Sequence, residues 1–181
     1  MKAVSHNRSG FTIVELLIVI VVIAILAAIS IVAYNGIQAR AETAKSVSAV
    51  ASWAKAIRMY SIDTDSWPTN SCLGKIDTYS ISYEGRCWAP DTSTWEVRQS
   101  FLTQMEPYIG STYPEPSIKN ITDVEATQYR GAMFLNVSST DNRIYAMLPK
   151  VSVCPSISGL GEAYSFASYT NGKRCMYRFA Q

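Results

Sequence analysis

The sequence predicts an α+β protein in which a long N-terminal helix packs its second half on a C-terminal antiparallel sheet. From Leu16 to Ala33 only Ser30 carries a polar side chain, and a helical apolar stripe follows to about Ile62. Beyond residue 126, alternating apolar and polar runs are separated by turn residues, which is typical of strands. The length of 181 residues and the apolar content of 48% fit one compact domain plus a membrane helix.

The apolar run predicts a transmembrane segment over residues 11–34. As a helix, Phe11–Ala33 would be about 34 Å long, against a hydrocarbon core of about 30 Å. A cleaved secretory signal is a poorer interpretation because its apolar region is only about 7–15 residues long. A plain membrane anchor fits the length but does not explain the one charge in the run, Glu15.

Two interpretations of Glu15 remain open. The carboxylate could lie near the membrane edge, where a charge costs less than at the centre of the bilayer. Alternatively, the helix leaves the bilayer and packs against copies of itself, where a buried carboxylate must find a cation. A chain cut between Gly10 and Phe11 would supply that cation as the new α-amino group.

The segment Gly10-Phe11-Thr12-Ile13-Val14-Glu15, followed by the apolar run, resembles the class III signal sequence of type IV pilins and pseudopilins. The resemblance implies cleavage after Gly10 by a prepilin peptidase that also N-methylates Phe11. It further implies that Glu15 pairs with the Phe11 amine of a neighbouring subunit and so sets the subunit register. The implied partners are other copies of the chain in a helical filament, the peptidase/methyltransferase, an assembly platform in the membrane, and lipid before assembly.

The sequence departs from this family at two positions. Many pilins have Pro where this chain has Val32, and often Gly where it has Ala24. A kink in the membrane helix is therefore not encoded by the usual helix breakers. Gly36 is the first weak point, with a cost of about 1 kcal/mol relative to Ala.

Residues 1–10 are predicted to be the cleaved leader. They contain Lys2, His6 and Arg8 and no acid, so the N-terminus is expected in the cytoplasm and residues after Tyr34 outside. We therefore expect a single-pass cytoplasmic-membrane protein that becomes part of an extracellular surface filament. His6 is the only histidine, so the mature chain could build neither a His-based catalytic triad nor most zinc sites.

Residues 35–62 are predicted to continue the helix, and residues 63–181 to form a globular head outside the cell. Asp63 and Asp65 end the helix before Pro68, and they lack the Gly and Glu of a calcium-binding loop. We expect no metal site and no cofactor. The apolar stripe expected to face the head consists of Val47, Val50, Ala51, Ala54 and Ile57, widened by Trp53 and Tyr60.

The head is predicted to be a two-layer structure of helix and sheet. A short strand is expected at Tyr79–Tyr83, and a helix capped by Ser93 or Thr94 that passes through Met105 and stops before Pro107. Asn171-Gly172 is a strong hairpin signal because both residues tolerate positive φ. The strands expected in an antiparallel meander are Tyr129–Val137, Arg143–Leu148, Ala163–Tyr169 and Lys173–Phe179.

The four cysteines, Cys72, Cys87, Cys154 and Cys175, allow three disulfide pairings. Sequence proximity favours Cys72–Cys87 and Cys154–Cys175, and the latter resembles the C-terminal disulfide loop of many pilins. An even number of cysteines in an exported domain fits an oxidising compartment. A four-cysteine zinc site is disfavoured because no two cysteines lie two to four residues apart.

The sequence thus favours a structural, non-enzymatic subunit of a type IV pilus-like filament, of the kind used for adhesion or motility. One alternative is a minor pilin or pseudopilin that primes a secretion or DNA-uptake fibre, with Lys173, Arg174 and Arg178 facing DNA. A membrane-anchored enzyme is disfavoured, because neither a carboxylate pair nor a Ser–Lys arrangement has a recognisable spacing. Without the leader, 14 basic residues balance 14 acidic ones, which argues against general nucleic-acid binding.

Overall fold

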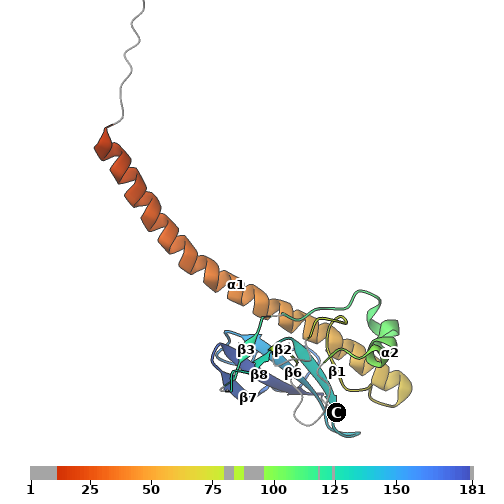
Figure 1. Cartoon of the computed structure of the whole chain (residues 1–181). Coiled ribbons are helices and arrows are strands. Elements are labelled where there is room, and N and C mark those ends of the chain that lie inside the picture. The colour runs from red at the N-terminus through yellow and green to blue at the C-terminus, as the bar shows by residue number, and fades with distance from the viewer. Residues whose placement is uncertain (1–11, 80–83, 88–95, 118, 124, 180–181) are drawn as a thin grey trace, which may run out of the picture. The chain divides into compact units, whose positions relative to one another are not determined.

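The computed structural model describes residues 12–79, 84–87, 96–117, 119–123 and 125–179. The chain divides into two compact units, Met1–Gln38 and Ala39–Gln181. The long helix α1 (Ile13–Thr64) contains the boundary between them (Figure 1). The predicted long N-terminal helix is confirmed, and it continues without interruption through Ala24 and Val32.

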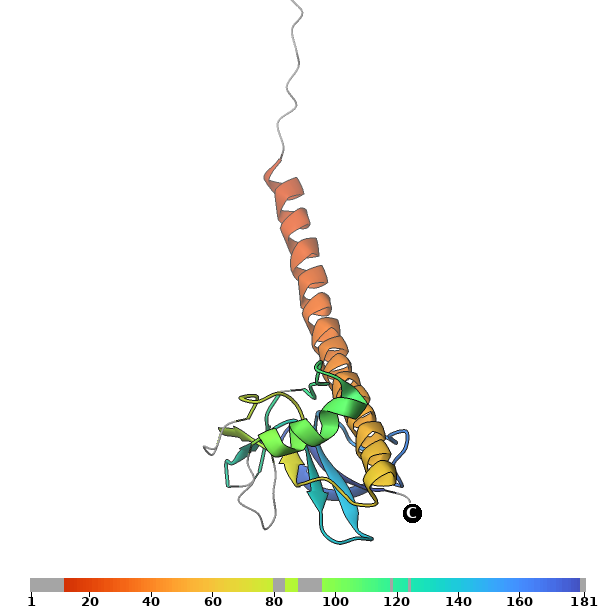
Figure 2. The same cartoon turned by 90° about the vertical axis from the view of Figure 1, so that its right-hand side faces the viewer.

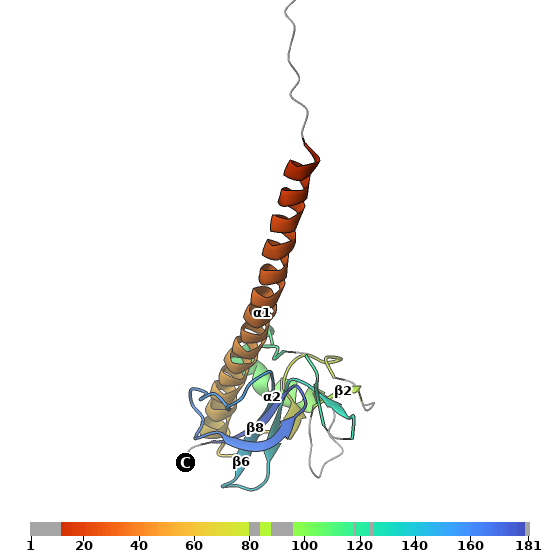
Figure 3. The same cartoon turned by 90° about the vertical axis from the view of Figure 1, so that its left-hand side faces the viewer.

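The second unit is built on a five-stranded antiparallel sheet, which confirms the α+β class. Its strand order is β1-β5-β6-β8-β7, and β6 and β8 lie side by side near its centre (Figure 3). The strands are β1 (Ser71–Cys72), β5 (Ala132–Asn136), β6 (Asn142–Pro149), β7 (Tyr164–Tyr169) and β8 (Gly172–Arg178).

A second, three-stranded sheet lies outside the main one. It has the order β2-β4-β3, formed by β2 (Glu84–Arg86), β3 (Ile121–Thr122) and β4 (Gln128–Tyr129). The pair β2–β4 is parallel, whereas β3–β4 is antiparallel. The predicted strand Tyr129–Val137 is split between the two sheets, because Tyr129 belongs to β4 and the main-sheet strand begins at Ala132.

The predicted meander is wrong in its strand order. In a meander β7 would pair with β6, but β8 lies between them and pairs with both. The connection from Pro149 to Tyr164 is long enough to pass the position of β8 before the chain enters β7. The chain then returns through a tight turn, so the hairpin between β7 and β8 forms as expected.

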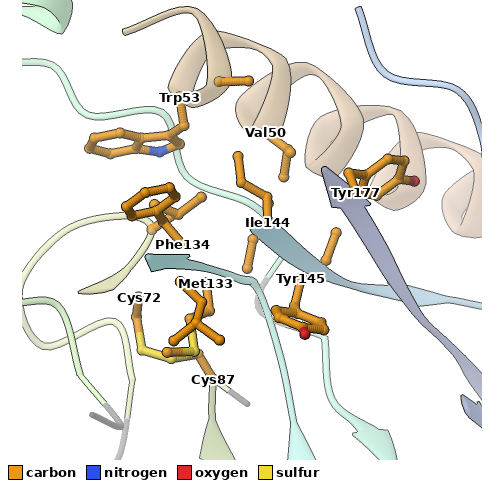
Figure 4. Packing of buried hydrophobic residues seen from close by; sticks show 14 of the residues in the cluster. Val50, Trp53, Cys72, Cys87, Met133, Phe134, Ile144, Tyr145 and Tyr177 are labelled. Atoms are coloured by element: carbon orange, nitrogen blue, oxygen red, sulfur yellow. A yellow bond between two sulfur atoms is a disulfide. The ribbon is translucent and has the colours of Figure 1, made fainter. Parts of the chain in front are cut away.

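The second half of α1 covers one face of the main sheet (Figure 4). Val50, Trp53 and Ile57 are completely buried there, as the predicted stripe requires. The indole of Trp53 lies 5.5 Å from the ring of Phe101 on α2 (Gln99–Ile109), the green helix that crosses α1 in Figure 2. Burying these large side chains contributes most of the attraction between helix and sheet.

The other face of the main sheet is also buried, so the predicted two-layer head is incomplete. Figure 4 shows Met133 and Tyr145 on the side opposite α1, next to the Cys72–Cys87 disulfide. Loop residues and the buried Ile121 of β3 contribute to the packing around the main sheet outside α1. Tyr79, buried within it, donates its hydroxyl hydrogen to the Leu73 carbonyl at 2.7 Å.

The helix α2 differs from the prediction at both ends. It begins at Gln99, and its N-cap residue Arg98 makes no capping hydrogen bond through its side chain. It also continues through Pro107 to Ile109. Pro107 lies in the last turn, where it removes one intrahelical bond, and the burial of α2 against the core compensates for this loss. The expected caps Ser93 and Thr94 lie outside the described residues, as do residues 80–83 of the expected strand.

Two disulfides tie loops to the main sheet. Cys72 is bonded to Cys87 and Cys154 to Cys175, with Cα–Cα distances of 5.9 and 5.7 Å. This is the pairing that sequence proximity favours. The bonded cysteines are 15 and 21 residues apart, and loops of this size contribute about 3 kcal/mol each on the chain-entropy model.

The β7–β8 turn uses Gly172 for close packing and not for its backbone angles. Tyr169 pairs with Gly172, so the turn residues are Thr170 and Asn171. Neither these two residues nor Gly172 has a positive φ. A Cβ at Gly172 would collide with the Leu148 carbonyl oxygen and lie 2.5 Å from the Ile121 side chain. The glycine therefore lets two strands approach each other.

We predict that Gly172→Ala destabilises the head by about 1–3 kcal/mol, because the added methyl group overpacks the sheet. Urea unfolding of the full chain, followed by tryptophan fluorescence, measures the change. Gly36→Ala is the matched control, since a Cβ there would meet no atom within 4 Å. Equal stability of Gly172→Ala and the parent chain would contradict the close approach at Gly172.

Candidate functional site

The first part of α1 presents an apolar surface that its own chain does not cover. Every large apolar side chain described between Ile13 and Ile31 is at least 48% exposed. By length and composition α1 can cross a membrane, and none of its most apolar 18-residue window is buried within the chain. Such a surface is stable only in lipid or against other apolar surfaces.

The hydroxyl group in the apolar run of α1 is satisfied within the helix. Ser30 donates its hydroxyl hydrogen to the Leu26 carbonyl at 2.7 Å. Because this hydroxyl is already hydrogen-bonded, Ser30 can be placed in a membrane or a packed helix bundle without an unpaired donor.

Glu15 closes a capping box at the start of α1. The Thr12 backbone N–H and hydroxyl both donate to Glu15 Oε2, at 2.8 and 2.7 Å. In return, the Glu15 backbone N–H donates to Thr12 Oγ1 at 3.2 Å. This reciprocal arrangement satisfies two amide groups that a helix N-terminus otherwise leaves unpaired.

The capping box occupies only one of the two carboxylate oxygens. Both bonds from Thr12 end on Glu15 Oε2, and within the described residues Oε1 has no hydrogen-bond partner. Gly10 and Phe11, the predicted cleavage and methylation residues, lie outside the described part of the chain. Glu15 thus has a local structural role and still has one oxygen able to accept another donor.

The three C-terminal cations considered for DNA binding do not form one patch. Arg174 is 7% exposed and lies 5.7 Å from the Tyr169 ring, and burial lowers its pKa from the ordinary value. Arg178 approaches the Asp141 carboxylate at 3.6 Å. Side-chain hydrogen bonds from Arg143 hold the pKa of Asp141 below its usual range. Arg174 is thus buried and Arg178 is paired with an acid, so the DNA-uptake alternative gains no support from these two residues.

Metal-binding residues do not gather in the described part of the chain, where no group of three or more His, Cys, Asp or Glu side chains is placed to hold an ion. All four cysteines are in disulfides.

Comparison with known proteins identifies the prokaryotic N-terminal methylation motif at residues 5–31. A fimbrial protein of Neisseria meningitidis serogroup B is 33% identical over 73 residues, which cover 40% of this chain and 43% of that protein. A type IV major pilin protein of Neisseria gonorrhoeae is 34% identical over 79 residues, which cover 44% and 48% of the two chains. The type II secretion system core protein G of Aeromonas hydrophila is 36% identical over 64 residues, or 35% and 45% of the two chains.

In each of these comparisons the match spans less than half of the relative's own length. No solved structure matches the chain. The chain thus carries the N-terminal methylation motif and is similar to type IV pilins and to secretion protein G over about two fifths of its length.

The capping box leads to a prediction about the first turn of α1. Thr12→Val removes the hydroxyl that accepts the Glu15 N–H, so amide hydrogen exchange at Glu15 should become about fivefold faster. Thr12→Ser keeps the hydroxyl and should retain the protection. NMR hydrogen exchange on the full chain in lipid nanodiscs measures both variants. Equal exchange in Thr12→Val and Thr12→Ser would show that the hydroxyl does not cap the helix.

Proposed function

We propose that this protein is a structural subunit of a type IV pilus-like surface filament, assembled by packing the apolar part of α1 against the same part of other copies. The observation that carries the proposal is the uncovered apolar surface of α1, which directly follows a methylation motif. In the filament, packing against other copies keeps that surface out of water, as lipid does before assembly, and close side-chain packing holds the helices together. The function is mechanical, and no step of it requires catalysis by this chain.

Before assembly, lipid covers the same surface. We place the N-terminus in the cytoplasm, because Lys2 and Arg8 precede the apolar run without any acid. Residues 39–181 then lie on the other side of the membrane, where the two disulfides are stable in an oxidising environment. After assembly, the subunit belongs to an extracellular filament.

Processing prepares the N-terminus for assembly. A prepilin peptidase on the cytoplasmic side cuts between Gly10 and Phe11 and methylates the new amino group, and a membrane platform then adds the subunit to the filament. The similarity to a type IV major pilin protein supports these partners. Cleavage creates a positive charge close to the start of α1, in a segment that otherwise has only Glu15 as a charge.

Glu15 can cap its own helix and pair with a neighbour at the same time. Oε2 holds Thr12, and Oε1 can accept a hydrogen bond from the Phe11 amine of another subunit. A charge-assisted bond inside an apolar bundle is strong and directional, so it fixes the axial register of the subunits. Burial holds the helices together, and the ion pair determines which residues face each other.

We predict that Glu15→Gln reduces filament number about as strongly as Glu15→Ala, whereas the unassembled protein stays in the membrane. Glutamine keeps the capping box, because its amide oxygen can accept the bonds from Thr12. However, its amide is uncharged and turns a donor toward the neighbour's amine, so the ion pair is lost. Electron microscopy of sheared filaments, with immunoblots of membrane fractions, measures both effects.

The pair of variants separates the two roles of Glu15. If Glu15→Gln assembles normally while Glu15→Ala does not, capping alone accounts for the residue. Normal filaments in both variants would remove Glu15 from the assembly mechanism altogether.

We also predict that Gly10→Val blocks cleavage, because a branched side chain occupies the position before the cut. Mass spectrometry of the membrane protein should then find residues 1–10 still attached, and filaments should be absent. Val14→Ala is a control inside the motif that changes an exposed apolar side chain of the helix and should be processed normally. A cleaved N-terminus in Gly10→Val would place the processing site elsewhere.

A pseudopilin is the second candidate function, supported by the similarity to a type II secretion system core protein G. Such a subunit would use the same packing surface but would build a short fibre that serves secretion. Deletion of the protein discriminates the candidates. Loss of surface filaments with normal secretion supports the pilus subunit, and loss of secreted proteins without loss of filaments supports the pseudopilin.

A further inference from the structure

We propose that the head binds a neutral oligosaccharide at the indole of Trp67, a function separate from assembly through α1. Two hollows of about 240 and 660 Å³ meet at this side chain and share Ser61 and Ser139. We call them together the Trp67 groove. It lies where the end of α1, the β5–β6 loop and the C-terminal end of β8 come together.

Trp67 is held as a rigid platform. Its Nε1–H donates to the Ser139 carbonyl at 3.2 Å. Its ring lies 5.0 Å from the Phe179 ring and 6.3 Å from the Phe134 ring, both of which are buried. The side chain is only partly buried, and it lines both hollows. A fixed aromatic surface of this kind can pack against the C–H groups of a sugar ring at little entropic cost.

Polar groups without protein partners surround the larger hollow. Within the described residues, the Asn136 amide, the Asp65 carboxylate and the Ser139 hydroxyl make no hydrogen bond or ion pair. Together they offer both donors and acceptors, which is the combination that sugar hydroxyls require. The larger hollow also falls in the range of about 300–1,000 Å³ that is usual for ligand sites.

The smaller hollow contains an unsatisfied buried group. Asn142 is 3% exposed, and its Nδ2 donates to the Ser138 carbonyl at 2.9 Å. Its Oδ1 is buried and has no hydrogen-bond partner in the described part of the chain. An unpaired amide oxygen is costly, and because Asn142 lines the smaller hollow, a ligand hydroxyl that reached Oδ1 would remove this cost.

The charges of the groove exclude other classes of ligand. Among the described residues that line the two hollows, Arg58 is the only basic one and Asp65 the only acidic one. A nucleic acid would need a row of cations, and an apolar peptide would leave the polar rim unpaired. Two hollows that meet at one indole suit a ligand with consecutive rings. A neutral oligosaccharide meets all of these conditions.

The test uses the full chain in lipid nanodiscs, which avoids sugar-based detergents. N,N′,N″-Triacetylchitotriose and cellotriose are the neutral probes and 3′-sialyllactose is the charged comparison, with binding followed by saturation-transfer NMR and calorimetry. We expect at least one neutral probe to bind and the charged sugar to bind more weakly. Asn136→Ala should weaken the binding about tenfold, because it removes hydrogen bonds to the ligand without removing a side-chain hydrogen bond within the described part of the head.

Trp67→Leu should abolish binding, and circular dichroism must show that this variant is folded, because Trp67 also packs on the core. Ser52→Ala, on an exposed part of α1 outside the Trp67 groove, is the matched control and should bind normally. The proposal is overturned if no neutral probe binds, if 3′-sialyllactose binds best, or if Asn136→Ala leaves the affinity unchanged. Because the test uses the unassembled chain, it is independent of whether filaments form.

Discussion

The constraint on which this protein depends is an apolar helix surface that the described residues of its own chain leave uncovered. The large side chains described from Ile13 to Ile31 are exposed, and the same helix turns amphipathic further along, where Val50, Trp53 and Ile57 are buried in the head. One element therefore serves two environments. Its second half obtains its apolar partner by folding, whereas the first half must obtain one from lipid or from other copies.

Features that depend on local periodicity were predictable from the sequence. The helix, its buried stripe and the presence of the β7–β8 hairpin follow from the spacing of nearby residues, although the turn itself lies at Thr170-Asn171 and not at Asn171-Gly172. The strand order was not predictable, because the pairing of β8 with β6 joins segments separated by a long connection. The second buried face of the sheet was missed for a similar reason. The continuous apolar runs in β5 and β6 do not reveal which loop covers them.

The candidate sites differ in the same way. The methylation motif is contiguous, so the sequence alone matches it at residues 5–31 and predicts roles for Gly10, Phe11 and Glu15. The spacing Thr12-x-x-Glu15 is also that of a capping box. This cap was not predicted from the sequence, because only the charge of Glu15 and a partner in another subunit were considered. The Trp67 groove carries no sequence signal, because folding assembles it from α1, the β5–β6 loop and the C-terminal end of β8.

The geometry at Glu15 also changes how the assembly of such helices is explained. Suppose that the Glu15 carboxylate had to break its bonds to Thr12 in order to pair with a neighbour. The bond to the neighbour would then have to be more stable than the bonds to Thr12. Instead, Thr12 occupies one oxygen and leaves the other available, so the proposed pairing would add a bond to an intact cap. The cap holds the carboxylate in a fixed position before any neighbour arrives, and a preorganised acceptor loses less entropy on binding. A single acid can therefore position the start of its own helix and the end of another.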